Sequence, residues 1–146
     1  MRLLFFSSMR GEGWGGSEEL WAAGAQAALA DGHRVCICVF DWEPAAAKLL
    51  ALRDAGASIV TRPLRVSRWQ PLLPRGAWLR ALDEFAPEAI CLSQGSTYEC
   101  VGRRSTRPFL GWLESQSAPL VDVLQFNRPR SGLRASTRRR CVRLFE

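Results

Sequence analysis

The sequence predicts an α/β fold, a doubly wound parallel sheet of about five strands with helices on both faces. Short apolar runs rich in β-branched residues alternate along the chain with longer segments of helical periodicity. Strands that alternate with helices form βαβ units with right-handed crossovers. The length of 146 residues, with 47% hydrophobic and 23% charged residues, suits one domain with a substantial core. Its apolar runs fall well short of the roughly 20 residues of a membrane-spanning helix.

The first βαβ unit has the clearest local signals. Arg2–Ser8 is predicted to be a strand because its centre is a run of four large apolar residues. Ser17–Asp31 is predicted to be a helix, with Ser17 as its N-cap and Gly32 just beyond its end. Val35–Phe40 is a continuous apolar run, which is typical of a strand buried on both faces.

The next elements repeat this alternation. Pro44–Ala55 is rich in alanine and leucine and begins with proline, which favours a helix. Ser58–Leu64 is predicted to be the third strand. Arg65–Arg75, rich in arginine, proline and tryptophan, is expected to be irregular, and Gly76–Phe85 is predicted to be helical.

The last elements complete a domain over residues 1–127. Ala89–Ser93 is predicted to be the fourth strand, residues 106–117 a helix, and Leu120–Phe126 the fifth strand. Residues 128–146 are expected to continue the same domain as an arginine-rich amphipathic helix. The apolar stripe of that helix is formed by Leu133, Cys141, Leu144 and Phe145.

The charge distribution argues against nucleic-acid binding. The net charge is +6, but residues 1–127 contain 13 basic and 13 acidic side chains, while residues 128–146 contain seven arginines and one glutamate. The body of the domain therefore lacks the basic field that nucleic acid requires. The arginine-rich segment is expected to be a surface helix. Contact with anionic lipid headgroups is the second interpretation of this segment, and nucleic acid is the third.

The cysteines and the N-terminus indicate a cytoplasmic protein without a metal. The five cysteines are Cys36, Cys38, Cys91, Cys100 and Cys141. An odd number, with an N-terminal apolar stretch too short for a signal peptide, favours reduced thiols. The C-x-C pair Cys36 and Cys38 is expected to point to one face of a buried strand. The single histidine, His33, cannot build a histidine-rich metal site.

The glycine-rich segment after the first strand is the principal candidate site. Gly11, Gly13 and Gly16 satisfy G-x-G-x-x-G, and Asp41 follows the second strand where a ribose-binding acid could sit. A dinucleotide is one interpretation, although Trp14 stands where a pyrophosphate would approach the backbone. A second interpretation is a loop without a ligand. A third follows from a resemblance to a known family.

Five segments in succession resemble the N-terminal domain of glycosyltransferase family 4, which has a GT-B fold. They are Arg2–Ser8, Trp14–Trp21 with its Gly-Gly-Ser-Glu, Ala28–Val35 with its Gly-His-Arg-Val, Glu88–Gly95 and Pro119–Asn127. The resemblance implies a Rossmann-like acceptor-side domain that works with a nucleotide-sugar donor as co-substrate and has no other cofactor. Its partners would be that donor and a sugar or lipid-linked acceptor, with the arginine-rich end at the inner membrane face as an alternative location.

The resemblance also implies the site residues. Gly15 and Gly16 would face the donor diphosphate, Trp14 would stack on a sugar or pack the loop, and Ser93, Gln94 and Gly95 would line the cleft. Many relatives place a histidine where this chain has Ser93 and Gln94, which leaves the catalytic residues unassigned. The family's donor-binding domain has no counterpart here, so the chain is expected to be truncated and inactive alone. The alternatives are an NAD(P)-binding Rossmann oxidoreductase domain and a non-catalytic Rossmann-like binding module.

Overall fold

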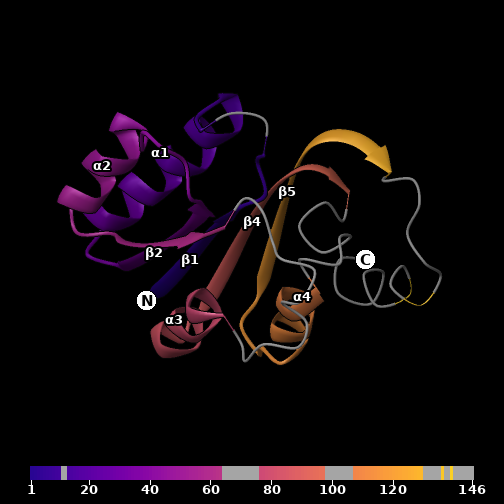
Figure 1. Ribbon diagram of the computed structural model, residues 1–146. Coiled ribbons are helices and arrows are strands. Elements are labelled where there is room, and N and C mark those ends of the chain that lie inside the picture. Colours follow the sequence, from indigo (N-terminus) through magenta and orange to yellow (C-terminus); the bar gives the residue numbers. More distant parts are fainter. Residues whose placement is uncertain (11–12, 64–75, 98–106, 130–135, 137–138, 140–146) are drawn as a thin grey trace.

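The chain folds as an α/β domain of parallel strands and helices (Figure 1). The computed structural model describes residues 1–10, 13–63, 76–97, 107–129, 136 and 139. Five strands lie within these residues: β1 (Arg2–Ser7), β2 (Arg34–Phe40), β3 (Ser58–Arg62), β4 (Ala89–Thr97) and β5 (Leu120–Pro129). Four helices connect them: α1 (Gly16–Ala30), α2 (Ala47–Asp54), α3 (Ala77–Phe85) and α4 (Arg107–Glu114). The predicted fold class is confirmed.

The strand order places a topological switch between β1 and β4. The sheet runs β3-β2-β1-β4-β5 with every neighbouring pair parallel. The chain leaves β1 toward one edge of the sheet and later returns to β4 on the other side of β1. In open parallel sheets, the carboxyl ends of strands at such a switch form the ligand-binding crevice.

β4 and β5 extend past the end of β1. Ser7, the last residue of β1, is in register with Ser93, but β4 continues to Thr97, which is paired with Pro129 of β5 (Figure 1). The strand expected to end at Ser93 is therefore longer, because β5 keeps pairing with it beyond the crevice. Gln94 and Gly95 accordingly lie inside β4. β5 also includes Arg128 and Pro129, the first two residues of the segment 128–146 that was expected to be helical.

Each face of the sheet packs on its own pair of helices (Figure 1). On the α1 and α2 face, the core contains Phe5, Val35, Ile37, Val39, Trp21, Ala25 and Leu52. On the α3 and α4 face, it contains Leu4, Phe6, Cys36, Cys38, Ile90, Leu92, Leu79, Leu82, Phe109 and Trp112. Successive residues of each strand alternate between these cores, as side chains with a period of two must.

The predicted orientation of the C-x-C pair is confirmed. Cys36 and Cys38 are buried free thiols on the α3 and α4 face. Burial raises the pKa of both thiols to about 12, because a thiolate is poorly solvated in an apolar core. Both side chains stay protonated at physiological pH and act as small apolar groups.

The start of α1 differs from the prediction. The N-cap is Gly15 rather than Ser17, and Ser17 lies inside the first turn of the helix. The Ser17 hydroxyl donates instead to the carboxylate of the next residue, Glu18, at 2.6 Å. The predicted helix end is confirmed, because Gly32 adopts the left-handed conformation (φ +76°) just after the C-cap residue Asp31.

Candidate functional site

The glycine loop lies at the carboxyl end of β1 and leads into α1. The carbonyl of Gly15 accepts bonds from the backbone N–H groups of Glu18 and Glu19 at 3.0 and 3.3 Å. Among the described residues, a Cβ on Gly16 would meet nothing within 4 Å, and one on Gly15 would meet only a Glu18 carboxylate oxygen at 3.5 Å. Within the described part of the chain, open space therefore faces the backbone at the two glycines expected to contact a diphosphate. Gly11 lies outside the described residues.

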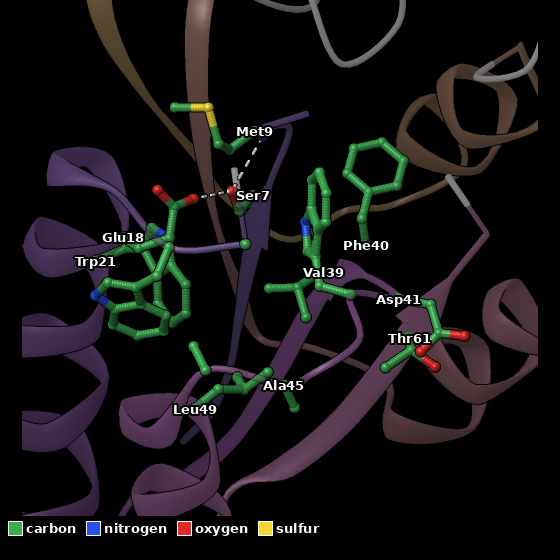
Figure 2. A pocket seen from close by; sticks show the side chains of 14 residues that line it. Ser7, Met9, Glu18, Trp21, Val39, Phe40, Asp41, Ala45, Leu49 and Thr61 are labelled. Atoms are coloured by element: carbon green, nitrogen blue, oxygen red, sulfur yellow. Dashed lines mark hydrogen bonds between the residues drawn. The ribbon is translucent and has the colours of Figure 1, made fainter. Parts of the chain in front are cut away.

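A buried carboxylate occupies the N-terminal turn of α1. Glu18 is only 2% exposed, and one of its oxygens accepts the hydroxyl of Ser7 at 2.7 Å (Figure 2). The other oxygen accepts the hydroxyl of Ser17 at 2.6 Å. The Ser7 hydroxyl also accepts the backbone N–H of Met9 at 3.2 Å, which ties the loop to the end of β1 (Figure 2). Because a negative charge offsets the positive end of the helix dipole, this arrangement weakens phosphate binding at the helix start.

Trp14 packs the glycine loop onto α1. Its ring meets Trp21 edge-on with centroids 5.5 Å apart, and its Nε1 donates to Glu19 at 2.8 Å. Glu19 also pairs with Lys48 of α2 at 2.5 Å, and the bonds from Lys48 and then Trp14 lower the pKa of this exposed carboxyl.

The cavity that the described residues form between the loop and the end of β2 is small. Trp42 lies against Gly13, where an added Cβ would be 3.4 Å from the Trp42 Cβ and Cγ. The cavity there, lined by Trp42, Asp41, Phe40 and Leu49 among others, has a volume of about 50 Å³ (Figure 2). That volume holds a few water molecules, whereas ligand pockets measure about 300–1,000 Å³.

Ser93 and Gln94 lie at the topological switch, inside β4 and level with the end of β1. The carbonyl of Ser93 accepts the backbone N–H of Ser8 at 2.9 Å, so β1 and β4 stay joined one residue beyond β1. Gln94 is 1% exposed, and its Nε2 donates to Asp122 Oδ1 of β5 at 2.7 Å. Gly95 follows in the same strand and is half-buried.

Three polar residues near these positions were not singled out in the sequence. Ser8 is 3% exposed, and its hydroxyl has no hydrogen-bond partner within the described part of the chain. Arg62 is 4% exposed, and its Nη2 donates to the carbonyl of Ser7. Its Cζ lies 4.3 Å from the ring centroid of Phe6 and 3.5 Å from that of Phe40. Asp122 is half-buried beside Gln94. A charged residue ending an apolar strand, as Arg62 does, is the signal that could have indicated this region.

Asp122 is expected to destabilise the fold when it ionises. Burial raises its pKa, and the bond from Gln94 only partly opposes this effect. A carboxyl with a raised pKa in the folded state favours folding most below its unfolded pKa of about 3.9, and that contribution is lost as the pH rises through its folded pKa. We therefore expect Asp122→Asn to be at least as stable as the wild type at pH 7, with the difference shrinking toward pH 4.

Urea unfolding at several pH values would measure this difference between the two proteins. Asp54→Asn is the matched control, because Asp54 is exposed and pairs only with its neighbour Arg53 among the contacts described. A lower stability of Asp122→Asn than of wild type at pH 7 would contradict the expectation.

The described residues contain no group of three or more His, Cys, Asp or Glu side chains that could hold a metal ion. Among the same residues, no helix has the length and apolar character needed to cross a membrane. Most of the arginine-rich segment lies outside the described residues; Ser136 and Arg139 within it are helical and exposed. Lipid contact by that segment stays a prediction.

Comparisons with protein families, with curated proteins and with solved structures found no match. Any function must therefore be argued from the site itself. Its features are an open glycine loop with a buried carboxylate on one side of the switch, and buried polar side chains on the other.

Proposed function

We propose that this chain is the acceptor-side domain of a glycosyltransferase. The observation that carries the proposal is the position of Ser8, Ser93 and Gln94 at the β1–β4 switch, beside a glycine loop with open space at Gly15 and Gly16. Such a domain needs hydroxyl-binding groups for an acceptor and backbone amides for weak contact with a donor diphosphate. Both kinds of group lie at the same edge of this sheet.

The electrostatics of the loop support an acceptor role over a primary nucleotide site. The buried Glu18 carboxylate opposes phosphate at the start of α1. In a two-domain transferase of the type that the sequence resembles, the other domain holds most of the donor, so only weak diphosphate contact is required here. The cavity of about 50 Å³ beside Trp42 and Asp41 argues against the alternative of an NAD(P)-binding oxidoreductase.

Titration of the ¹⁵N-labelled chain with UDP-glucose, GDP-mannose and NADPH, followed by amide chemical shifts, tests this proposal. We expect weak binding of a nucleotide sugar, with a Kd on the order of 1 mM, and shifts at Gly15 and Gly16. Gly16→Ala should abolish these shifts, because its methyl group would stand in the open space at the loop.

Gly111→Ala is the matched control for this titration. Gly111 is also a helical glycine at which an added Cβ meets no described residue within 4 Å, but it lies in α4, away from the glycine loop. Micromolar binding of NADPH that is lost in Asp41→Ala would overturn the proposal in favour of an oxidoreductase. The absence of shifts with every nucleotide sugar would overturn it as well.

A further inference from the structure

Four polar side chains form a row across the sheet near its carboxyl edge, on the face that packs against α3 and α4. We call Arg62, Ser8, Gln94 and Asp122 the polar row. Arg62 contacts the Phe6 ring and bonds to the Cys38 thiol, both on this face. Gln94 follows Ile90 and Leu92 at a spacing of two, and Asp122 follows Leu120, so alternation places them there too.

The row runs across the sheet through neighbouring strands. Arg62 ends the edge strand β3 and reaches over the Phe40 ring to the carbonyl of Ser7 in β1. Ser8, just beyond the end of β1, is the next member of the row, and its backbone N–H donates to the Ser93 carbonyl of β4. Gln94 of β4 then bonds to Asp122 of the other edge strand, β5. The hydroxyl and the amide in the middle therefore lie beside the topological switch.

The buried hydroxyl of Ser8 is the feature that indicates a ligand. A buried polar group without a partner costs about 1–3 kcal/mol. Ser8 is 3% exposed, and its Oγ has no hydrogen-bond partner in the described part of the chain. By contrast, the hydroxyls of the nearby Ser7 and Ser17 both donate to the Glu18 carboxylate. A ligand hydroxyl at the switch would give Ser8 the missing bond.

The charges of the row indicate a neutral ligand. Its positive group, Arg62, and its acidic group, Asp122, come from opposite edge strands, and a hydroxyl and an amide lie between them. A phosphate would be attracted to Arg62 but repelled by the carboxylates of Asp122 and Glu18. A polyhydroxylated ring carries no net charge and can both donate and accept bonds with hydroxyl and amide groups.

We infer that the polar row binds a neutral, hydroxyl-rich ring of the acceptor, with Ser8 and Gln94 as its contacts and Asp122 as the positioning residue for the Gln94 amide. The bond from Gln94 Nε2 to Asp122 fixes which way the amide points. The identification of the ring as an acceptor sugar rests on the proposed function. The binding site itself rests on the geometry of the row.

Amide and side-chain chemical shifts of the complete chain, titrated with methyl α-D-glucopyranoside and methyl α-D-mannopyranoside, test this inference. Inorganic pyrophosphate serves as the anionic probe. We expect at least one glycoside to shift the Gln94 side-chain NH₂ and the Ser8 amide, with little effect of pyrophosphate on these signals. If pyrophosphate shifts the Gln94 signals at lower concentration than both glycosides, or neither glycoside shifts them, the inference is wrong.

Ser8→Ala separates a binding role from a structural one. Removing an unpartnered buried hydroxyl should leave the free chain as stable as wild type or more stable, yet weaken glycoside binding about fivefold through loss of one hydrogen bond. Ser58→Ala makes the same chemical change at an exposed position at the opposite end of the sheet and should alter neither property. Unchanged glycoside affinity in Ser8→Ala would overturn the inference.

Variants at Asp122 test the positioning role. Asp122→Ala should weaken glycoside binding, and Asp122→Asn should restore it, because an asparagine oxygen can still accept the Gln94 bond. Equal losses in both variants would contradict the role. If the chain binds a glycoside but no nucleotide sugar, the polar row is a binding site and the proposed function is wrong. If it binds a nucleotide sugar but no glycoside, only the inference about the polar row is wrong.

Discussion

Trp112→Ala is expected to lower the free energy of unfolding by about 4 kcal/mol, within the range for loss of a large buried aromatic side chain. Trp112 is fully buried and lies almost parallel to Phe109, with centroids 5.6 Å apart. Phe109 in turn stacks on Phe6 of β1 at 3.9 Å. The substitution would leave a void between α4 and the sheet on the face that carries the polar row. Because domains of this kind are stable by only about 5–15 kcal/mol, we expect a large share of the stability to be lost.

Trp112→Phe provides the control for this prediction. It keeps an aromatic ring in the core but removes the bond from Trp112 Nε1 to Asp83 Oδ1, which measures 2.6 Å. Since Asp83 is exposed and can bond to water instead, we expect a smaller loss of about 1–2 kcal/mol. Urea unfolding followed by circular dichroism measures both values. A loss below about 1 kcal/mol for Trp112→Ala would contradict the packing described for this face.

Glu18→Ala is expected to cost about 2–4 kcal/mol, because it leaves two buried hydroxyls without their acceptor. Ser7 and Ser17 both donate to this carboxylate, and all three side chains are buried. The loss should be accompanied by faster amide hydrogen exchange in the glycine loop, since the Ser7 hydroxyl also accepts the N–H of Met9. Chemical unfolding and hydrogen exchange measure these two effects.

Glu18→Gln separates the charge of this residue from its hydrogen bonds. The amide oxygen can still accept one serine hydroxyl, so the loss of stability should be smaller than in Glu18→Ala. Without the negative charge, the start of α1 should bind pyrophosphate more tightly, by a factor of about two to five for a helix-dipole effect of 0.3–1 kcal/mol. Glu19→Gln is the matched control in the same helical turn, because Glu19 is exposed. Unchanged pyrophosphate affinity in Glu18→Gln would refute this electrostatic account.

The sequence was enough to predict the order of strands and helices because their signals are local. The apolar run at Val35–Phe40 and the glycine after α1 each act within a few residues. The boundaries were less predictable. β4 extends to Thr97 only because β5 pairs with it, and α1 begins at Gly16, so that Ser17 lies inside the helix and bonds to Glu18. Both outcomes depend on contacts that a one-dimensional pattern does not contain.

At the candidate site, the sequence alone predicts that the glycine loop follows the first strand and that Ser93 belongs to the fourth. Both follow from local periodicity. The folded chain adds that β4 pairs with β1 on one side, which brings Ser8 to Ser93, and with β5 on the other, which brings Gln94 to Asp122. Strand order and register arise from pairing between segments far apart in the chain, and the face on which each side chain lies changes with a shift of one residue. For that physical reason, the polar row becomes visible only in the folded chain.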